Sequence, residues 1–150
     1  MQQLVDDALN ASDDHRFPGH SGFNLTGKSI HTLREGEWLD DAVINSYLNM
    51  IQMRSDDQGY PSVLFYDSFH YTFLANGRPD FLPNCMTKTN LMGYDYLFFP
   101  IHLVNHWAFA YASTRNRKLY YLDSVYGYDK GMEVLGRLQK YIYQEESMLK

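Results

Sequence analysis

The sequence predicts an α+β domain in which helices come first, strands follow and a further helix comes last. Three observations predict this order. Apolar residues recur at helical spacing over residues 43–51, apolar and aromatic runs cover residues 94–122, and a second helical stripe covers about 132–148. Helices and strands that do not alternate regularly are typical of α+β folds. At 150 residues, the chain is long enough for one domain with a buried core.

The first 22 residues are predicted to be an arm that precedes the domain. The arm begins with a short helix over residues 4–9 and continues through the connector 17–22, which contains Gly and Pro. A short extended piece at 23–25 then opens the domain, which is expected to cover residues 23–150.

The clearest predicted helix begins at Asp40 or Asp41. Either carboxylate can cap it by accepting hydrogen bonds from free N–H groups at the positive end of the helix dipole. Residues 55–59, which end in glycine, are expected to end the helix. The apolar face that it should bury consists of Val43, Ile44, Tyr47, Leu48 and Ile51.

The middle of the chain is predicted to form a short strand over 63–66 and a helical turn over 69–74. Asn76-Gly77-Arg78-Pro79 should end that turn, and residues 80–93 have the composition of a loop. The last helix should bury an apolar stripe formed by Val134, Leu135, Leu138, Tyr141 and Ile142.

Two apolar runs, over residues 94–111 and 119–122, flank a polar turn at 113–118. Adjacent strands would bring together His106, in the first run, and Asp123, at the end of the second. A histidine beside an aspartate is typical of nucleophilic catalysis, in which the carboxylate orients the imidazole and the other ring nitrogen takes a proton from Cys or Ser. A structural pair is the simpler interpretation of these two residues by themselves. The aromatic residues expected to fill the core are Tyr94, Tyr96, Phe98 and Phe99.

Neither nearby candidate has the setting of a nucleophile. Ser124 adjoins Asp123 and should face away from His106 along an extended chain. Cys85 lacks an adjacent cation or a helix N-terminus that would lower its pKa, so an ordinary half-buried thiol is expected. Cys85 as the nucleophile is retained as a minor hypothesis. The six histidines do not have zinc-ligand spacing, and neither a metal nor another cofactor is predicted.

Composition narrows the classes of partner. The formal net charge of −5 provides no basic field for nucleic acid, and no apolar run approaches the ~18 residues of a membrane helix. The mildly acidic surface would suit a basic protein partner. The single cysteine excludes an intrachain disulfide and fits a reducing compartment, the nucleus or the cytoplasm.

Four motifs occur in a specific order: Trp38-Leu39-Asp40-Asp41 within residues 33–47, the aromatic stretch 65–69, His106-Trp107-Ala108, and residues 119–124 ending in Asp-Ser. This order resembles the ubiquitin-like-protein protease family, papain-like cysteine peptidases that process and remove SUMO (the Ulp/sentrin protease type, peptidase family C48). The resemblance covers roughly residues 23–150. It implies a papain-like α+β fold with an N-terminal helical lobe and a C-terminal mixed-sheet lobe.

The resemblance also implies roles for five residues. His106 would be the general base and Asp123 its orienting acid. Trp38 and Trp107 would form the roof of a narrow tunnel over the Gly-Gly tail of the modifier. Two indole rings a few ångströms apart leave room for a backbone without Cβ atoms, so only glycine passes. Asp41 would pair with a basic residue of the modifier.

One part of the family pattern has no match in the 150 residues. The family has an oxyanion-hole Gln followed by the catalytic Cys of an Asp-Cys-Gly run, and neither can be assigned to a position of this sequence. The fold is therefore expected to be incomplete at the C-terminus, with an exposed apolar face, and this chain alone is expected to be inactive. The alternative hypothesis is a cysteine-less module that binds a ubiquitin-like modifier or another protein partner.

Overall fold

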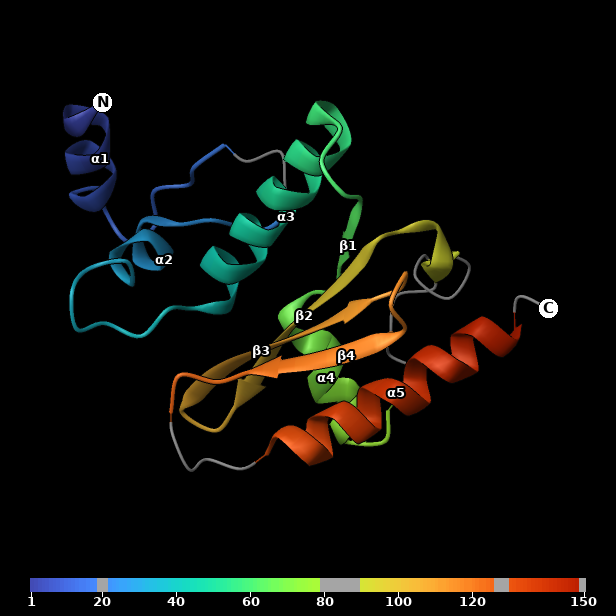
Figure 1. Ribbon diagram of the computed structural model, residues 1–150. Coiled ribbons are helices and arrows are strands. Elements are labelled where there is room, and N and C mark those ends of the chain that lie inside the picture. Colours follow the sequence, from blue (N-terminus) through green and yellow to red (C-terminus); the bar gives the residue numbers. More distant parts are fainter. Residues whose placement is uncertain (19–21, 79–89, 126–129, 149–150) are drawn as a thin grey trace. The chain divides into compact units, whose positions relative to one another are not determined.

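The structure, a computed structural model, describes residues 1–18, 22–78, 90–125 and 130–148 (Figure 1). The chain divides into two compact units, Met1–Ile51 and Gln52–Lys150. The predicted boundary between an arm and a domain at residue 22 remains a prediction.

The first unit is helical, as expected. Helix α1 spans Gln2–Leu9, and a five-residue helix that the sequence analysis missed, α2, spans Gly27–His31. Thr26 caps α2, because its side-chain oxygen accepts a hydrogen bond from the Ser29 N–H at 3.2 Å. Only glycine fits at position 27, since the Cβ atom of any other residue would lie 2.0 Å from the carbonyl oxygen of Ser12.

Helix α3 spans Asp41–Gln58 and crosses the boundary between the units. Its cap is Asp40, whose Oδ1 accepts a hydrogen bond from the Val43 N–H at 2.9 Å. The predicted apolar face was only partly right, because Leu48 is buried whereas Tyr47 is 63% exposed.

The second unit contains a mixed sheet with strand order β1-β2-β3-β4 (Figure 1). Strand β1 pairs in parallel with β2, and the other pairings are antiparallel. The four strands are β1 (Val63–Phe65), β2 (Tyr96–Leu103), β3 (His106–Ser113) and β4 (Lys118–Leu122).

The expectation that residues 94–111 form a single strand was wrong. The chain folds back between Leu103 and His106, and these two residues pair across the resulting hairpin. Asn105 adopts a φ of 54°, a left-handed conformation that asparagine tolerates better than most residues. The turn is not apparent in the sequence because Val104 at its tip is apolar, although the side chain is exposed.

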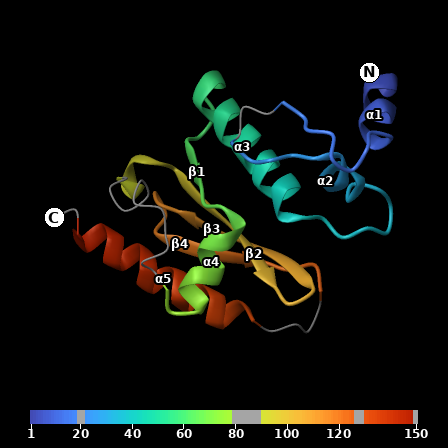
Figure 2. The same cartoon turned by 180° about the vertical axis from the view of Figure 1, so that it is seen from behind.

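Two helices, α4 (Ser68–Ala75) and α5 (Gly131–Met148), cover one face of the sheet (Figure 2). Their boundaries agree with the predicted helical turn and the predicted last helix. Ala108, Ala110 and Ala112 of β3 face the helices, and their small side chains allow close approach. The buried core on this face also includes Leu97, Phe99, Ile101, Tyr71, Val134, Leu138 and Tyr141.

The opposite side of the sheet carries a group of rings that we call the aromatic face. Residues of a strand alternate between the two sides, so Tyr96 and Phe98 lie here and are half-buried, whereas only Phe99 of their predicted core group is fully buried. Helices α4 and α5 pack against the other side of the sheet. The members of the aromatic face are Tyr96, Phe98, Trp107, Phe109, Tyr111 and Tyr120.

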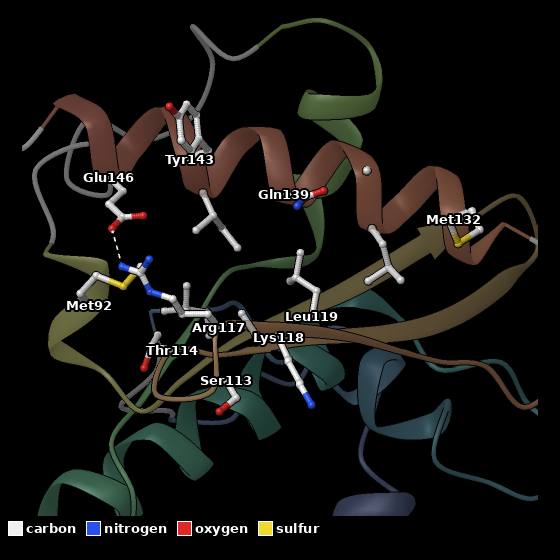
Figure 3. A pocket seen from close by; sticks show the side chains of 15 residues that line it. Met92, Ser113, Thr114, Arg117, Lys118, Leu119, Met132, Gln139, Tyr143 and Glu146 are labelled. Atoms are coloured by element: carbon white, nitrogen blue, oxygen red, sulfur yellow. Dashed lines mark hydrogen bonds and ion pairs between the residues drawn. The ribbon is translucent and has the colours of Figure 1, made fainter.

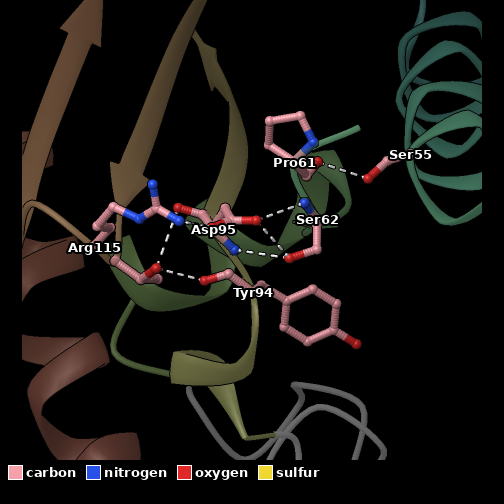
Figure 4. Close-up of polar contacts among 7 residues, drawn as sticks. Ser55, Pro61, Ser62, Tyr94, Asp95 and Arg115 are labelled. Carbon is pink, nitrogen blue, oxygen red and sulfur yellow. Dashed lines mark hydrogen bonds and ion pairs between the residues drawn. The ribbon is translucent and has the colours of Figure 1, made fainter. Parts of the chain in front are cut away.

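A polar cluster holds the start of β2 beside the segment that leads into β1 (Figure 4). One carboxylate oxygen of Asp95 accepts hydrogen bonds from the N–H of Ser62 at 2.9 Å and from its hydroxyl at 3.1 Å. The Asp95 N–H donates back to the Ser62 side chain at 3.0 Å. These bonds, the backbone one first, lower the pKa of Asp95, which also lies 3.8 Å from Arg115.

His70 of α4 is buried in the core with an exposure of only 2%. Its ring lies 4.3 Å from that of Tyr66 and 4.6 Å from that of Tyr141, between centroids. Neither imidazole nitrogen has a hydrogen-bond partner among the described residues. Burial therefore disfavours the charged form and lowers the pKa of His70 from 6.5 to about 3.

This depressed pKa predicts that acid destabilises the fold. Below pH 6.5 the unfolded chain binds a proton at His70 that the folded chain excludes until the pH approaches about 3. The free energy of unfolding should therefore fall by about 2 kcal/mol between pH 6.5 and pH 5 through this residue alone. Urea unfolding of the unchanged protein and of His70→Phe at both pH values measures the effect. Equal pH dependence in the two proteins would contradict it, and His15→Phe is the control.

Candidate active site

The structure brings His106 and Asp123 together, although they are 17 positions apart in the sequence. His106 opens β3, and Asp123 directly follows β4, which pairs with β3. His106 Nε2 lies 2.6 Å from Asp123 Oδ1, and the two side chains are 13% and 10% exposed. Most of the surface of both side chains is therefore shielded from water, although solvent still reaches a small part of each.

Two further groups hold the Asp123 carboxylate. The Val125 N–H donates to Oδ1 at 2.8 Å, and the Tyr121 hydroxyl donates to Oδ2 at 2.8 Å. The Val125 bond is the largest cause that lowers the pKa of Asp123, followed by the bonds from Tyr121 and His106. The sequence analysis missed Tyr121. Its position two residues before Asp123 on the same side of an extended chain is a signal that could have identified it.

The carboxylate determines which imidazole nitrogen is basic. An ionised Asp123 can only accept hydrogen bonds, so Nε2 of a neutral His106 carries the hydrogen. Nδ1 is then the nitrogen that can take a proton from a nucleophile. This arrangement can supply a general base and stabilise the imidazolium that forms when the base is protonated.

Neither nucleophile candidate, Ser124 or Cys85, gains support from the structure. Ser124 is exposed beside Asp123, and Cys85 lies outside the described residues. Among the described residues, no three His, Cys, Asp or Glu side chains are grouped so that they could hold a metal ion. No helix in the described ranges is long and apolar enough to cross a membrane.

The predicted substrate-binding residues lie in both units. Trp107 follows His106 on β3, with its ring centroid 4.5 Å from that of His102. Trp38 is 64% exposed and precedes α3, and Asp41 is the first residue of α3. Asp40, rather than Asp41, caps that helix. The pairing of Trp38 with Trp107 over a substrate remains a prediction.

A separate cavity of about 450 Å³ lies between α5 and the end of the β3–β4 hairpin (Figure 3). Its lining combines apolar residues such as Met132 and Leu119 with the polar Gln139 and the ion pair between Arg117 and Glu146, whose nitrogen and oxygen are 3.2 Å apart. Neither His106 nor Asp123 lines this cavity.

Comparison with known proteins identifies the family. Residues 37–150 match the sequence pattern of the Ulp1 protease family, C-terminal catalytic domain. The chain belongs to the Ulp1 protease family. Membership confirms the resemblance found in the sequence. The mixed sheet and its helices agree with the predicted α+β class, and similarity to solved Ulp1 domains confirms the fold.

Two relatives match all or most of this chain. Mouse sentrin-specific protease 2 is 34% identical over all of this chain and 25% of its own length. Ubiquitin-like-specific protease 1A of Arabidopsis thaliana is 29% identical over 92% of this chain and 30% of its own length. This member of the Ulp1 family therefore spans about a quarter to a third of the length of these relatives.

Two solved structures show the same fold. SUMO protease Ulp1 with its catalytic cysteine oxidised to a sulfinic acid is 27% identical, with a TM-score of 0.77 over 97% of this chain and 65% of the solved chain. The Ulp1 protease domain in complex with SMT3, the yeast ortholog of SUMO, is 25% identical, with a TM-score of 0.77 over 97% of this chain and 66% of that one.

The contacts of Asp123 predict the effect of removing a single hydroxyl. Tyr121→Phe deletes the hydrogen bond to Oδ2 and keeps the ring, so the pKa of Asp123 should rise toward its ordinary value of 3.8. Carbon-13 NMR of the aspartate carboxyl groups during a pH titration measures this change. Tyr120→Phe removes a neighbouring hydroxyl that is not bonded to Asp123 and should leave the titration unchanged. An unchanged curve for Tyr121→Phe would show that this bond does not stabilise the carboxylate.

Proposed function

We propose that this chain supplies the general base, its orienting acid and the substrate-recognition residues of a SUMO-type thiol protease. The observation that carries the proposal is the contact of 2.6 Å between His106 and Asp123 in a member of the Ulp1 family. A catalytic cysteine is named in one of the structural relatives. None of the 150 residues is assigned as the corresponding thiol, because no position matches the Asp-Cys-Gly run of the family.

The proposed reaction uses both ring nitrogens of His106. Nδ1 takes the proton of the thiol, and the thiolate attacks the carbonyl carbon of the last glycine of the modifier's Gly-Gly. Asp123 stabilises the imidazolium through Nε2. The tetrahedral intermediate collapses to a thioester, and the imidazolium gives its proton to the leaving amine. Water, deprotonated by Nδ1, then hydrolyses the thioester and releases the modifier and the thiol.

Substrate recognition would rest on Trp38, Trp107 and Asp41. The exposed ring of Trp38 and the half-buried ring of Trp107 are suited to enclose a tail without side chains. Asp41 would pair with a basic residue of the modifier. The complex of the Ulp1 relative with SMT3 supports a ubiquitin-like protein as the partner. Thiol chemistry and a single cysteine fit an intracellular, reducing compartment.

We expect the 150 residues alone to leave a fluorogenic SUMO substrate uncleaved, because no position matches the oxyanion-hole Gln or the Asp-Cys-Gly run of the family. Sequencing the transcript past the codon for Lys150 tests the source of the thiol. A Gln followed by an Asp-Cys-Gly run would support the proposal. In the protein that contains this cysteine, His106→Gln should lower kcat by about 10²–10⁴. A stop codon, with SUMO binding by the folded chain, would instead support the non-cleaving binding module.

The tunnel hypothesis predicts strict selection for glycine. A modifier whose tail ends in Gly-Ala should bind about tenfold or more weakly than one ending in Gly-Gly, because a methyl group must fit between the indole rings. Isothermal titration calorimetry with both tails measures the ratio. Trp107→Ala should bring the two affinities closer together. Equal affinities of the unchanged protein for both tails would refute the tunnel.

A further inference from the structure

The β2–β3 hairpin places His102 directly opposite Trp107 in the strand register. Their ring centroids are 4.5 Å apart, and the ring planes are inclined by 38°. His102 is exposed, whereas Trp107 is half-buried. The imidazole therefore covers part of the indole from the solvent side of the hairpin.

The position of Trp107 explains why such a neighbour matters. Strand β4 ends at Leu122, which pairs with Phe109, so the β3–β4 pairing stops before it reaches Trp107. On the other side, the β2–β3 pairing continues to Leu103 and His106. At Trp107, strand β2 therefore provides the only strand neighbour within the described sheet, and His102 is the residue opposite.

We propose that His102 is a positioning residue that holds the Trp107 indole in the orientation required to enclose the Gly-Gly tail. This inference rests on the proposed function, which gives Trp107 its role at the tail. A tryptophan side chain turns about two dihedral angles, and a ring packed at 4.5 Å restricts both. The apparent affinity is proportional to the fraction of molecules whose ring is in place. Loss of the His102 ring should therefore weaken tail binding about two- to tenfold.

The sheet offers a matched control. Tyr111 and Tyr120 form a second cross-strand ring pair, with centroids 4.6 Å apart and planes inclined by 11°. Tyr120→Ala removes an exposed ring from that pair, and Trp107 keeps its own neighbour. His102→Ala removes the ring that contacts Trp107, and His102→Phe replaces it with another planar ring.

The first measurement follows Trp107 directly and needs no modifier. The chain has two tryptophans, so a Trp38→Phe background makes Trp107 the only one. Acrylamide quenching and fluorescence anisotropy then report how exposed and how mobile its ring is. His102→Ala should increase quenching and lower anisotropy, and His102→Phe and Tyr120→Ala should change neither. An unchanged signal in His102→Ala would overturn the proposal, provided that circular dichroism shows the variant to be folded.

The second measurement is the affinity for a SUMO protein with a free Gly-Gly tail, with Trp38 restored. His102→Ala should raise the Kd about two- to tenfold, and His102→Phe should return it to the original value. If His102→Phe restores the anisotropy and leaves binding weak, His102 acts through its imidazole chemistry and the positioning role is wrong. If Trp107→Ala has no effect on binding, the proposed function fails at Trp107, even where the anisotropy shows that His102 holds the ring.

Discussion

The antiparallel register of β3 against both neighbouring strands is the constraint on which the candidate site depends. It pairs Leu103 with His106 on one side and Phe109 with Leu122 on the other. Because side chains alternate between the two sides of a sheet, a slip of one residue would move every side chain of a strand to the other side. Asp123 would then leave His106, and His102 would no longer lie opposite Trp107. The β3–β4 register therefore brings His106 and Asp123 together, and the β2–β3 register places His102 opposite Trp107.

Packing against the helices supports that register. The alanines of β3 permit close approach, and the first residue of α5, Gly131, passes so near the ring of Tyr121 that a Cβ atom would lie 2.9 Å from it. The hydroxyl of the same tyrosine donates to Asp123. The start of α5 and the orientation of the acid are thus linked through one side chain. At the other end of the sheet, the bonds between Ser62 and Asp95 hold β1 beside β2.

Much of this arrangement follows from local sequence patterns. Apolar periodicity predicted α3 and α5, and the alternation of polar turns with apolar runs predicted that His106 and Asp123 meet. The β2–β3 hairpin escaped detection because its turn contains the apolar Val104 rather than a polar pair. The short α2 has too few residues to show a period. Contacts such as those of Tyr121 and His102 depend on strand pairing, which a single sequence shows only indirectly.

The meander formed by β2, β3 and β4 also affects the order in which parts of the protein can fold. Its contacts connect residues close in sequence, and such short separations favour rapid folding. His106 meets Asp123 across 17 positions, whereas the proposed meeting of the two indoles would connect positions 38 and 107. During synthesis on a ribosome, His106 and Asp123 therefore emerge almost together, whereas a pairing of Trp38 with Trp107 would have to await the synthesis of about 70 further residues.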